Sequence, residues 1–433
     1  MVDNTAVRKG TGFWIPVLAL SGVPFIMVLG NSMLIPILPD IRNALNLSPL
    51  QISLLITLFS VPAGIVIPVA GFFSDRFGRK IVIIPSLVIY GLGGVIAALG
   101  AIILNQHSYP VILTGRILQG IGAAGTAPIA MALCGDLFSG KERSRALGAI
   151  ESSNGLGKVL SPIIGSAVGI IVWYAAFILF PVIIIPVVIA MWLLVKEPKI
   201  GRNKQTLHQY LLSIVKVLRI KTGLFFSTYL AGAIALMILF GVLFYLSEYL
   251  EYQFGLNGIL KGLALAVPVL FMSAASFFTG FMIKRKKLLM KILVIAGLLL
   301  MTLSLVFLPL AKNVIFYFTA ISVVGIGTGI ILPCLNTLIT GAASIEERGL
   351  VTSLYGSVRF LGVAFGPPLF GFLMARSVGL MFWSSAGLTL LAAVLVLIFL
   401  KLPQENAGAG ESEKTRGLVL IPEPVPKPGN NTN

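Results

Sequence analysis

Residues 71–80 read Gly-Phe-Phe-Ser-Asp-Arg-Phe-Gly-Arg-Lys, and this decapeptide joins two long apolar runs. The runs cover 52–73 and 81–104, and each is long enough to cross a bilayer as a helix. Between them lie one acid, three bases and the helix-breaking Gly78. Two membrane spans are therefore joined by a short basic turn, which we expect on the cytoplasmic side.

The whole chain has the composition of a membrane protein. Of its 433 residues 57% are hydrophobic and 11% are charged, whereas soluble domains carry about 25% charged residues. Strand-like alternation is absent, so helices must satisfy the backbone polar groups in lipid. We predict twelve spans, at 13–38, 49–73, 81–104, 110–134, 146–170, 174–195, 222–247, 258–283, 288–310, 314–338, 349–375 and 379–400.

The net charge of +17 follows this topology. With both termini in the cytoplasm, 25 of the 32 Lys and Arg lie at or near the cytoplasmic ends of the spans. The others lie at the opposite ends (Arg42, Lys261, Lys312, Arg376) or within spans (Arg116, Lys158, Arg359). This asymmetry is the positive-inside rule. It predicts a multi-pass protein of the cell (inner or plasma) membrane that attracts anionic lipid, and it argues against a nucleic-acid partner.

The longest polar interruption, 196–221, divides the chain into two halves of six spans. Its apolar residues recur at helical spacing among bases, which predicts an amphipathic helix on the membrane surface or a simple tether. We therefore expect a cytoplasmic N-terminal tail (1–12), two six-helix bundles (13–195 and 222–400), a cytoplasmic central loop (196–221) and a disordered cytoplasmic tail (401–433).

The two halves repeat each other at a constant offset of 205 residues. The matches are Gly120 with Gly325, Gly122 with Gly327, Pro128 with Pro333, Glu142-Arg143 with Glu347-Arg348, Gly157 with Gly362, and Pro162 with Pro367. Parallel six-helix repeats are an architecture of secondary transporters, whose substrate site lies between halves that rock around it. The predicted fold is an all-α polytopic membrane protein of two pseudo-symmetric six-helix bundles.

Over residues 13–400 the chain resembles the major facilitator superfamily, in its twelve-helix drug:proton antiporter branch of bacterial multidrug efflux type. The first signature consists of Gly71, Asp75, Arg76, Gly78, Arg79 and Lys80. The resemblance implies an inner gate there; the alternative is an anchor for topology alone. The repeated loop from Gly280 reads GFMIKRKKLL and has Lys284 in place of Asp75, which favours the gate.

Two further signatures lie in the fourth and fifth spans. Arg116-x-x-Gln119-Gly120-x-Gly122-Ala-Ala resembles the branch's fourth-span pattern and implies a role in proton coupling for Arg116; the alternative is a snorkelling arginine. Gly157, Ser161, Pro162 and Gly165 resemble its antiporter pattern, with Ser161 in place of a glycine. That pattern is associated with exporters.

Glu151, Asn154 and Lys158 lie on one face of the fifth span because they are spaced by three and four residues. We expect this stripe to line a central cavity, with Glu151 and Lys158 joined through Asn154 or water. Glu151 is then the proton-carrier candidate, with Arg116 and Lys158 as coupling partners. The alternative is a structural ion pair that locks the span.

Substrate-cavity candidates are polar residues within spans: Asn31, Gln119, Asn154, Asn336 and Arg359. Many members of the branch carry an acid in the first span, where this chain has Asn31, which cannot carry a proton. Glu248 and Glu251 end the seventh span, and we expect them to be solvated.

The leading functional hypothesis is export of small amphipathic compounds or drugs in exchange for protons. The second is dedicated export of one metabolite such as a siderophore, for which Lys158 and Arg359 favour an anion. The third is lipid or glycolipid translocation. No nucleophile–base or metal-ligand set is evident, so we expect no enzyme activity, cofactor, metal or catalytic residue. The expected partners are a small-molecule substrate, protons and the lipid bilayer, and the protein is expected to be a monomer.

Overall fold

The computed structural model describes residues 11–198, 206, 209–210, 212, 219, 222–283, 286–311, 313–342 and 348–400. The predicted tails 1–12 and 401–433, apart from Thr11 and Gly12, lie outside these residues, and so do most of the predicted surface helix in 196–221 and Lys284 of the repeated loop.

Every long element in the described ranges is an α-helix, as the sequence predicts. The α-helices are α1 (Thr11–Ser32), α2 (Leu38–Leu45), α3 (Pro49–Phe77), α4 (Arg79–Leu104), α5 (Tyr109–Ala124), α6 (Ala127–Leu137), α7 (Gly140–Gly169), α8 (Ala175–Leu194), α10 (Thr222–Phe254), α11 (Gly258–Ile283), α12 (Lys287–Phe307), α13 (Val314–Ala342), α14 (Arg348–Met374) and α15 (Val378–Phe399). Short 3-10 turns are η1 (Ile35–Ile37), η2 (Asn105–His107) and η3 (Leu308–Leu310).

These helices form twelve spans in the described chain. Eleven segments are long and apolar enough to cross a membrane by length and composition, and α7, which carries Glu151 and Lys158, is the twelfth. Two predicted spans are broken. The first runs through α1, η1 and α2, with Pro36 and Pro39 in the turns after α1. The fourth is split into α5 and α6 at Gly125-Thr126, just before Pro128 in the first turn of α6.

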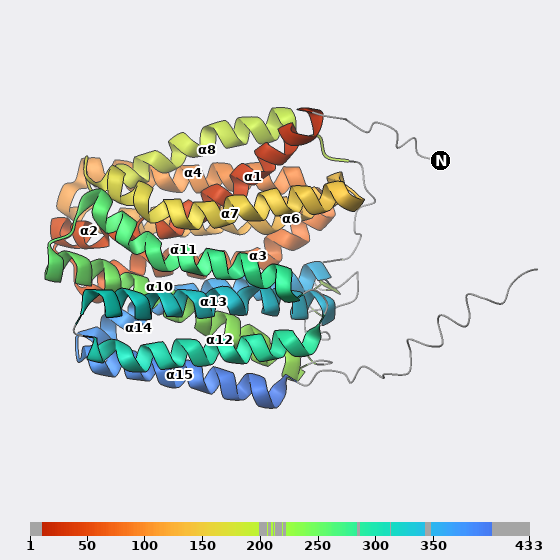
Figure 1. The fold of residues 1–433 in the computed structure, drawn as a ribbon. Coiled ribbons are helices and arrows are strands. Elements are labelled where there is room, and N and C mark those ends of the chain that lie inside the picture. The colour runs from red at the N-terminus through yellow and green to blue at the C-terminus, as the bar shows by residue number, and fades with distance from the viewer. Residues whose placement is uncertain are drawn as a thin grey trace, which may run out of the picture. The chain divides into compact units, whose positions relative to one another are not determined.

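The two halves contact each other mainly through α3 and α14. In Figure 1 the red-to-yellow helices of the first half and the green-to-blue helices of the second gather on opposite sides of the bundle. The Thr57 hydroxyl donates to the Ala364 carbonyl (2.7 Å), and the Ser357 hydroxyl donates to the Gly64 carbonyl. Further contacts along the same pair of helices join Pro49 with Gly371 and Gly71 with Ser353.

The second contact between the halves, α7 with α11, is concentrated toward one end. A Cβ on Gly262 would lie 2.6 Å from the Pro162 carbonyl oxygen, and Gly258 lies against Ile170. Toward the other end, a Cβ on Gly148, Gly155 or Gly280 would meet no described atom within 4 Å. We call the tightly joined end the Glu248 end and the opposite one the Gly78 end, after residues at the tips of α10 and α3.

Glycines of the repeat make equivalent contacts in the two halves. A Cβ on Gly120 in α5 would lie 2.1 Å from the Phe59 carbonyl oxygen of α3, and one on Gly325 in α13 would lie 2.2 Å from the Pro268 oxygen of α11. The same correspondence relates Gly122 against α4 to Gly327 against α12, and Gly157 against α1 to Gly362 against α10. At five of these glycines (Gly120, Gly122, Gly325, Gly327 and Gly362) one helix approaches another too closely for any side chain, and at Gly157 the contact is tight.

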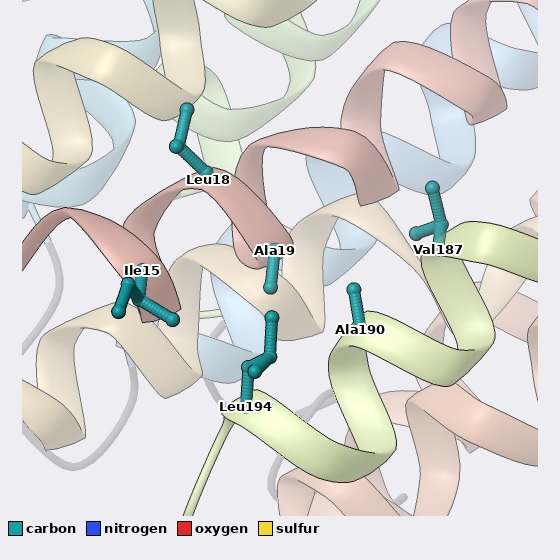
Figure 2. Close-up of a pocket in the computed structure, with 6 residues that line it drawn as sticks. All are labelled: Ile15, Leu18, Ala19, Val187, Ala190 and Leu194. Atoms are coloured by element: carbon teal, nitrogen blue, oxygen red, sulfur yellow. The ribbon is translucent and has the colours of Figure 1, made fainter.

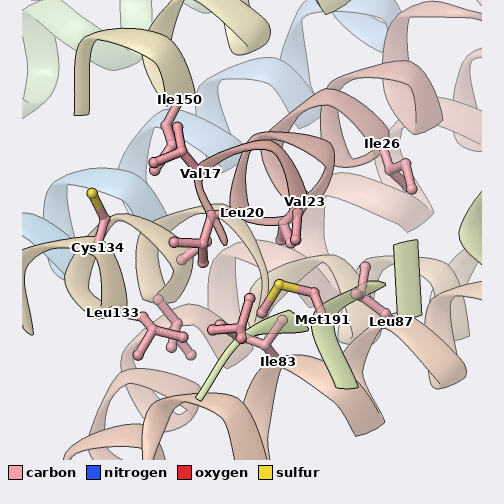
Figure 3. Packing of buried hydrophobic residues seen from close by; sticks show 14 of the residues in the cluster. Val17, Leu20, Val23, Ile26, Ile83, Leu87, Leu133, Cys134, Ile150 and Met191 are labelled. Atoms are coloured by element: carbon pink, nitrogen blue, oxygen red, sulfur yellow. The ribbon is translucent and has the colours of Figure 1, made fainter. Parts of the chain in front are cut away.

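A buried apolar cluster holds the first half together. Figure 3 shows Leu20 and Val23 of α1 packed with Ile83 of α4, Leu133 of α6 and Met191 of α8. Ile150 of α7, Phe59 of α3 and Ala123 of α5 also belong to the cluster, so seven of the described helices contribute to it. The cluster fixes the helices on which the candidate site residues of the first half lie.

Gly165→Ala should destabilise the protein, whereas Gly148→Ala in the same helix should not. A Cβ on Gly165 would lie 2.0 Å from the Met33 carbonyl oxygen, and the backbone there cannot give way cheaply. Overpacking costs about 1–3 kcal/mol, so we expect the Tm in detergent to fall by roughly 5 °C. An equal Tm for both variants would show that α1 and α7 do not pack this closely.

Candidate functional site

The basic decapeptide forms a tight turn whose charges are paired within the first half. Gly78 has φ 121° and ψ 150°, a conformation open to little other than glycine. The Arg79 guanidinium pairs with Asp75 one turn earlier and with Asp136 of α6 (3.2 Å). Arg79 also donates to the Ser74 hydroxyl (2.9 Å). The network therefore joins α3, α4 and α6.

Glu197 completes this network, and no sequence pattern predicted its role. Its carboxylate accepts hydrogen bonds from the backbone N–H groups of Arg79 (2.5 Å) and Lys80 (3.1 Å) and so caps the first turn of α4. The Lys80 ammonium donates to the Trp192 and Val195 carbonyls at the end of α8, both at 2.7 Å. The chain after α8 is thereby fastened to the turn.

Two residues from outside the first half lie next to the decapeptide: Tyr210 of the central loop and Ser353 of α14. The Tyr210 ring lies 5.2 Å from the Phe72 ring, and its hydroxyl bonds to Ser353 of α14. Burial raises the pKa of the Tyr210 phenol, so this group stays a neutral donor at physiological pH. A residue of the central loop therefore lies where the inner gate is predicted. The gating role of Gly71, Asp75, Arg76, Gly78, Arg79 and Lys80 stays a prediction.

Arg116 is fully buried in α5, away from any carboxylate in the described chain. Its Nε donates to the Leu55 carbonyl (2.8 Å) and its Nη1 donates to the Gly30 carbonyl (3.0 Å) and to Gln119 Oε1 (2.7 Å). Its guanidinium also lies 4.4 Å from the centre of the Phe59 ring. It is not a snorkelling arginine, because it is fully buried among these partners; its role in proton coupling stays a prediction.

The stripe on α7 is not an internal ion pair. No hydrogen bond or ion pair in the described chain joins Glu151, Asn154 and Lys158, so the expected bridge through Asn154 is absent. Glu151 is exposed, Lys158 is half-buried, and the buried Asn154 Oδ1 has no partner. The charges of Glu151 and of Arg359 in α14 both act on the Lys158 ammonium. The structure thus brings together residues from both halves that the sequence proposed separately.

The remaining substrate-cavity candidates divide into buried and exposed groups. Asn31 is buried, and its Nδ2 donates a long hydrogen bond to the Ser60 hydroxyl of α3 (3.4 Å). Gln119 is fully buried beside Arg116. Asn336 of α13 is exposed, and the described residues give its side chain no hydrogen-bond partner.

The antiporter motif packs α7 against α1. Gly157 lies on Phe25, Gly165 lies on the Met33 backbone, and the Ser161 hydroxyl donates weakly to the Leu29 carbonyl (3.4 Å). Pro162 faces Gly262 of α11 in the second half. Ser161 is fully buried, so a serine fits where the pattern has glycine.

The expectation that Glu248 and Glu251 are solvated is wrong. Glu248 is only 7% exposed, and its carboxylate accepts from Arg42 of α2 at 3.0 Å, which joins the two halves. Glu251 pairs with the buried Lys261 of α11 (2.5 Å). The Ser247 hydroxyl donates to the Ile35 carbonyl (2.8 Å), also across the halves. Because α10 extends to Phe254, the end of this helix covers α2 instead of entering solvent.

An apolar hollow on the flank of the first half is not part of the site. It lies between α1 and α8 and is lined by Ile15, Leu18, Ala19, Val187, Ala190 and Leu194 (Figure 2). These side chains offer no polar group to a ligand. Within the described ranges, no group of three or more His, Cys, Asp or Glu side chains could hold a metal ion.

Two repeated six-helix halves around buried polar groups define a polytopic protein with the architecture of a membrane transporter. A model of the Major Facilitator Superfamily matches residues 20–362 and 291–428. The chain belongs to this superfamily.

Relatives and solved structures agree with this assignment. The chain is 41% identical over 383 residues to the bacillibactin exporter of Bacillus subtilis (strain 168), covering 88% of this chain and 95% of that protein. It is 26% identical over 370 residues to multidrug resistance protein 2 of the same organism, covering 82% and 88%. The human organic anion transporter MFSD10 (TETRAN) has the same fold, with a TM-score of 0.70, 18% identity and coverage of 89% and 99%.

Breaking the bond between Arg42 and Glu248 should open the Glu248 end. Ser247→Cys would report this opening, because Ser247 is fully buried under the Ile35 carbonyl. A charge-assisted hydrogen bond contributes about 1.5–3 kcal/mol, so we expect Arg42→Gln or Glu248→Gln to raise its labelling rate by a hydrophilic maleimide about tenfold. The measurement uses protein in nanodiscs with Cys134 and Cys334 replaced by serine.

Glu251→Gln is the matched control for this experiment. It removes the same charge from the same helix but breaks only the pair with Lys261, which lies within the second half. Labelling should then stay at the parent rate. Equal rates in the parent, Arg42→Gln and Glu248→Gln would show that the ion pair does not hold the halves together.

Proposed function

We propose that this chain is a secondary transporter that exports a siderophore of the bacillibactin type across the cell membrane in exchange for protons. The observation that carries the proposal is the 41% identity to the bacillibactin exporter over 95% of that protein's length. A match of this extent includes both halves and the residues between them. Multidrug resistance protein 2 matches over a similar extent at only 26% identity.

The arrangement of the halves supports transport by alternating access. The halves are joined by the Arg42–Glu248 pair at one end, while Gly148 and Gly155 of α7 and Gly280 of α11, toward the other end, have open space around them. The bases gather at the Gly78 end, so this end is assigned to the cytoplasm together with both termini. In this assignment the substrate enters between the halves from the cytoplasm, and the Glu248 end must part to release it outside.

Proton exchange rests on Arg116, Glu151 and Lys158. Glu151 lies about a third of the way along α7, is exposed, and has no described cation at ion-pair distance. Asn31 leaves α1 without an acid, and Glu151 is the proton-carrier candidate.

Broad drug efflux is the second candidate function. The antiporter motif of α7 and the similarity to multidrug resistance protein 2 favour it. The two functions differ in selectivity, since a drug exporter accepts amphipathic compounds with little regard to their polar groups.

The proposal is tested by transport in proteoliposomes with an imposed pH gradient. Bacillibactin and ethidium serve as the siderophore and the drug. We expect bacillibactin to move against its gradient only when the pH gradient is present, and ethidium to move at least tenfold more slowly. Ethidium transport without bacillibactin transport would assign the chain to drug efflux. Bacillibactin transport without dependence on the pH gradient would remove proton exchange.

Asp75→Asn and Arg116→Gln should each reduce bacillibactin transport at least tenfold. Asp75→Asn removes the charge of one partner of Arg79, and Arg116→Gln removes the hydrogen bonds that the guanidinium donates to the Leu55 and Gly30 carbonyls. Arg376→Gln, which removes a charge at the other end of the bundle, is the control and should transport normally. Membrane insertion is measured for all three variants. Parental rates in the first two would contradict the roles carried over from the family motifs.

A further inference from the structure

Among the buried guanidinium and amide groups without a hydrogen-bond partner, donors outnumber acceptors. Three buried nitrogen atoms have no acceptor among the described residues: Arg116 Nη2, Gln119 Nε2 and Arg359 Nε. The unpartnered amide acceptors are Asn31 Oδ1 and Asn154 Oδ1. The Lys158 ammonium adds up to three further donors, for which the described chain supplies no acceptor. Unpaired buried donors cost free energy, which a bound ligand can recover.

These donors are linked through one aromatic contact between the halves. The Arg116 guanidinium lies over Phe59 of α3, and the Phe59 ring lies 6.5 Å from that of Phe360 in α14. Arg359 is the neighbour of Phe360, and its guanidinium lies 5.4 Å from the centre of the Tyr355 ring. The Tyr355 hydroxyl is also buried without a partner. Arg116 of the first half therefore contacts this aromatic pair, and Arg359 of the second half is next to it in the chain.

The charged side chains near these donors carry an excess of positive charge. Arg116, Lys158 and Arg359 are cationic, and none of them lies within 4 Å of a carboxylate in the described chain. Glu151 is the carboxylate whose charge acts on Lys158, while Arg359 acts on it with the same sign. Cations held inside the span region without counter-ions are costly and mark functional sites. An anionic ligand would remove this cost.

We propose that the site between the halves selects substrates that carry anionic oxygen groups, and that Lys158 and Arg359 are its specificity-determining residues. The proposal rests on the proposed transport function and names the substrate class. The guanidinium of Arg359 can bind two oxygens of one group, and the ammonium of Lys158 acts as a mobile point charge. Carboxylates, catecholates and hydroxamates, the oxygen ligands with which siderophores hold iron, belong to this class.

The proposal is tested by equilibrium dialysis of radiolabelled 2,3-dihydroxybenzoate and dopamine against the full chain in nanodiscs. The two compounds share a catechol ring and carry opposite charges at pH 7. We expect 2,3-dihydroxybenzoate to bind at least tenfold more tightly. Lys158→Met and Arg359→Met should each weaken its binding about tenfold, and Lys158→Arg should keep most of it. Equal or tighter binding of dopamine would overturn the proposal.

Arg376→Gln is the matched control for charge. It also removes one cation from the second half, but it lies 17 residues after Arg359, about 25 Å further on at 1.5 Å per helical residue. Binding should be unchanged in this variant, and the Tm of each variant checks that it is folded. Equal weakening in Arg376→Gln would indicate an effect of net charge and overturn the assignment to Lys158 and Arg359. Because no transport is measured, selective anion binding can be found even if siderophore export is not.

Discussion

The close approach of helix backbones at glycines is the constraint on which the rest of the structure depends. In a bilayer, burial of apolar side chains between helices gains little, so helices associate through tight packing of small residues. Gly120 allows α5 to pack against the Phe59 backbone of α3, at a separation that leaves no room for a Cβ. Gln119 is adjacent to this contact and Arg116 lies one turn earlier. Their hydrogen bonds to each other and to α3 therefore follow from a backbone contact that the sequence marks with a glycine.

The charged residues at the two ends of the bundle make different kinds of contact. At the Gly78 end, Arg79 and Glu197 join α3, α4, α6 and the chain after α8, all within the first half. At the Glu248 end, Arg42 and Glu248 join one half to the other. Halves that rock need rigid interiors and contacts between them that can break. The decapeptide meets the first need in this structure and the Arg42–Glu248 pair meets the second.

The sequence predicted what depends on local pattern and missed what depends on distant partners. Apolar runs and the repeat predicted the twelve spans and two halves, because length and small-residue spacing are local properties. Helical spacing placed Glu151, Asn154 and Lys158 along one face of α7, but it did not predict that Glu151 is exposed while Asn154 is buried. The ion pair of Arg42 with Glu248 was not, because its members belong to different halves and the sequence gives no distance between them. Glu197 was missed because the backbone groups that it caps lie more than 100 residues earlier in the chain.

The absence of an acid at Asn31 is consistent with an anionic substrate. Arg116 is held by backbone carbonyls and by the Gln119 side chain. None of these groups titrates, so the uptake of a proton cannot neutralise a partner of Arg116. A proton route from this arginine to an acid in α1 is therefore not available, because α1 carries Asn31 and no Asp or Glu. An anion leaving a cell that is negative inside gains about 2.3 kcal/mol per charge at 100 mV. Export of an anion therefore needs less energy from a second ion gradient than export of a cation does.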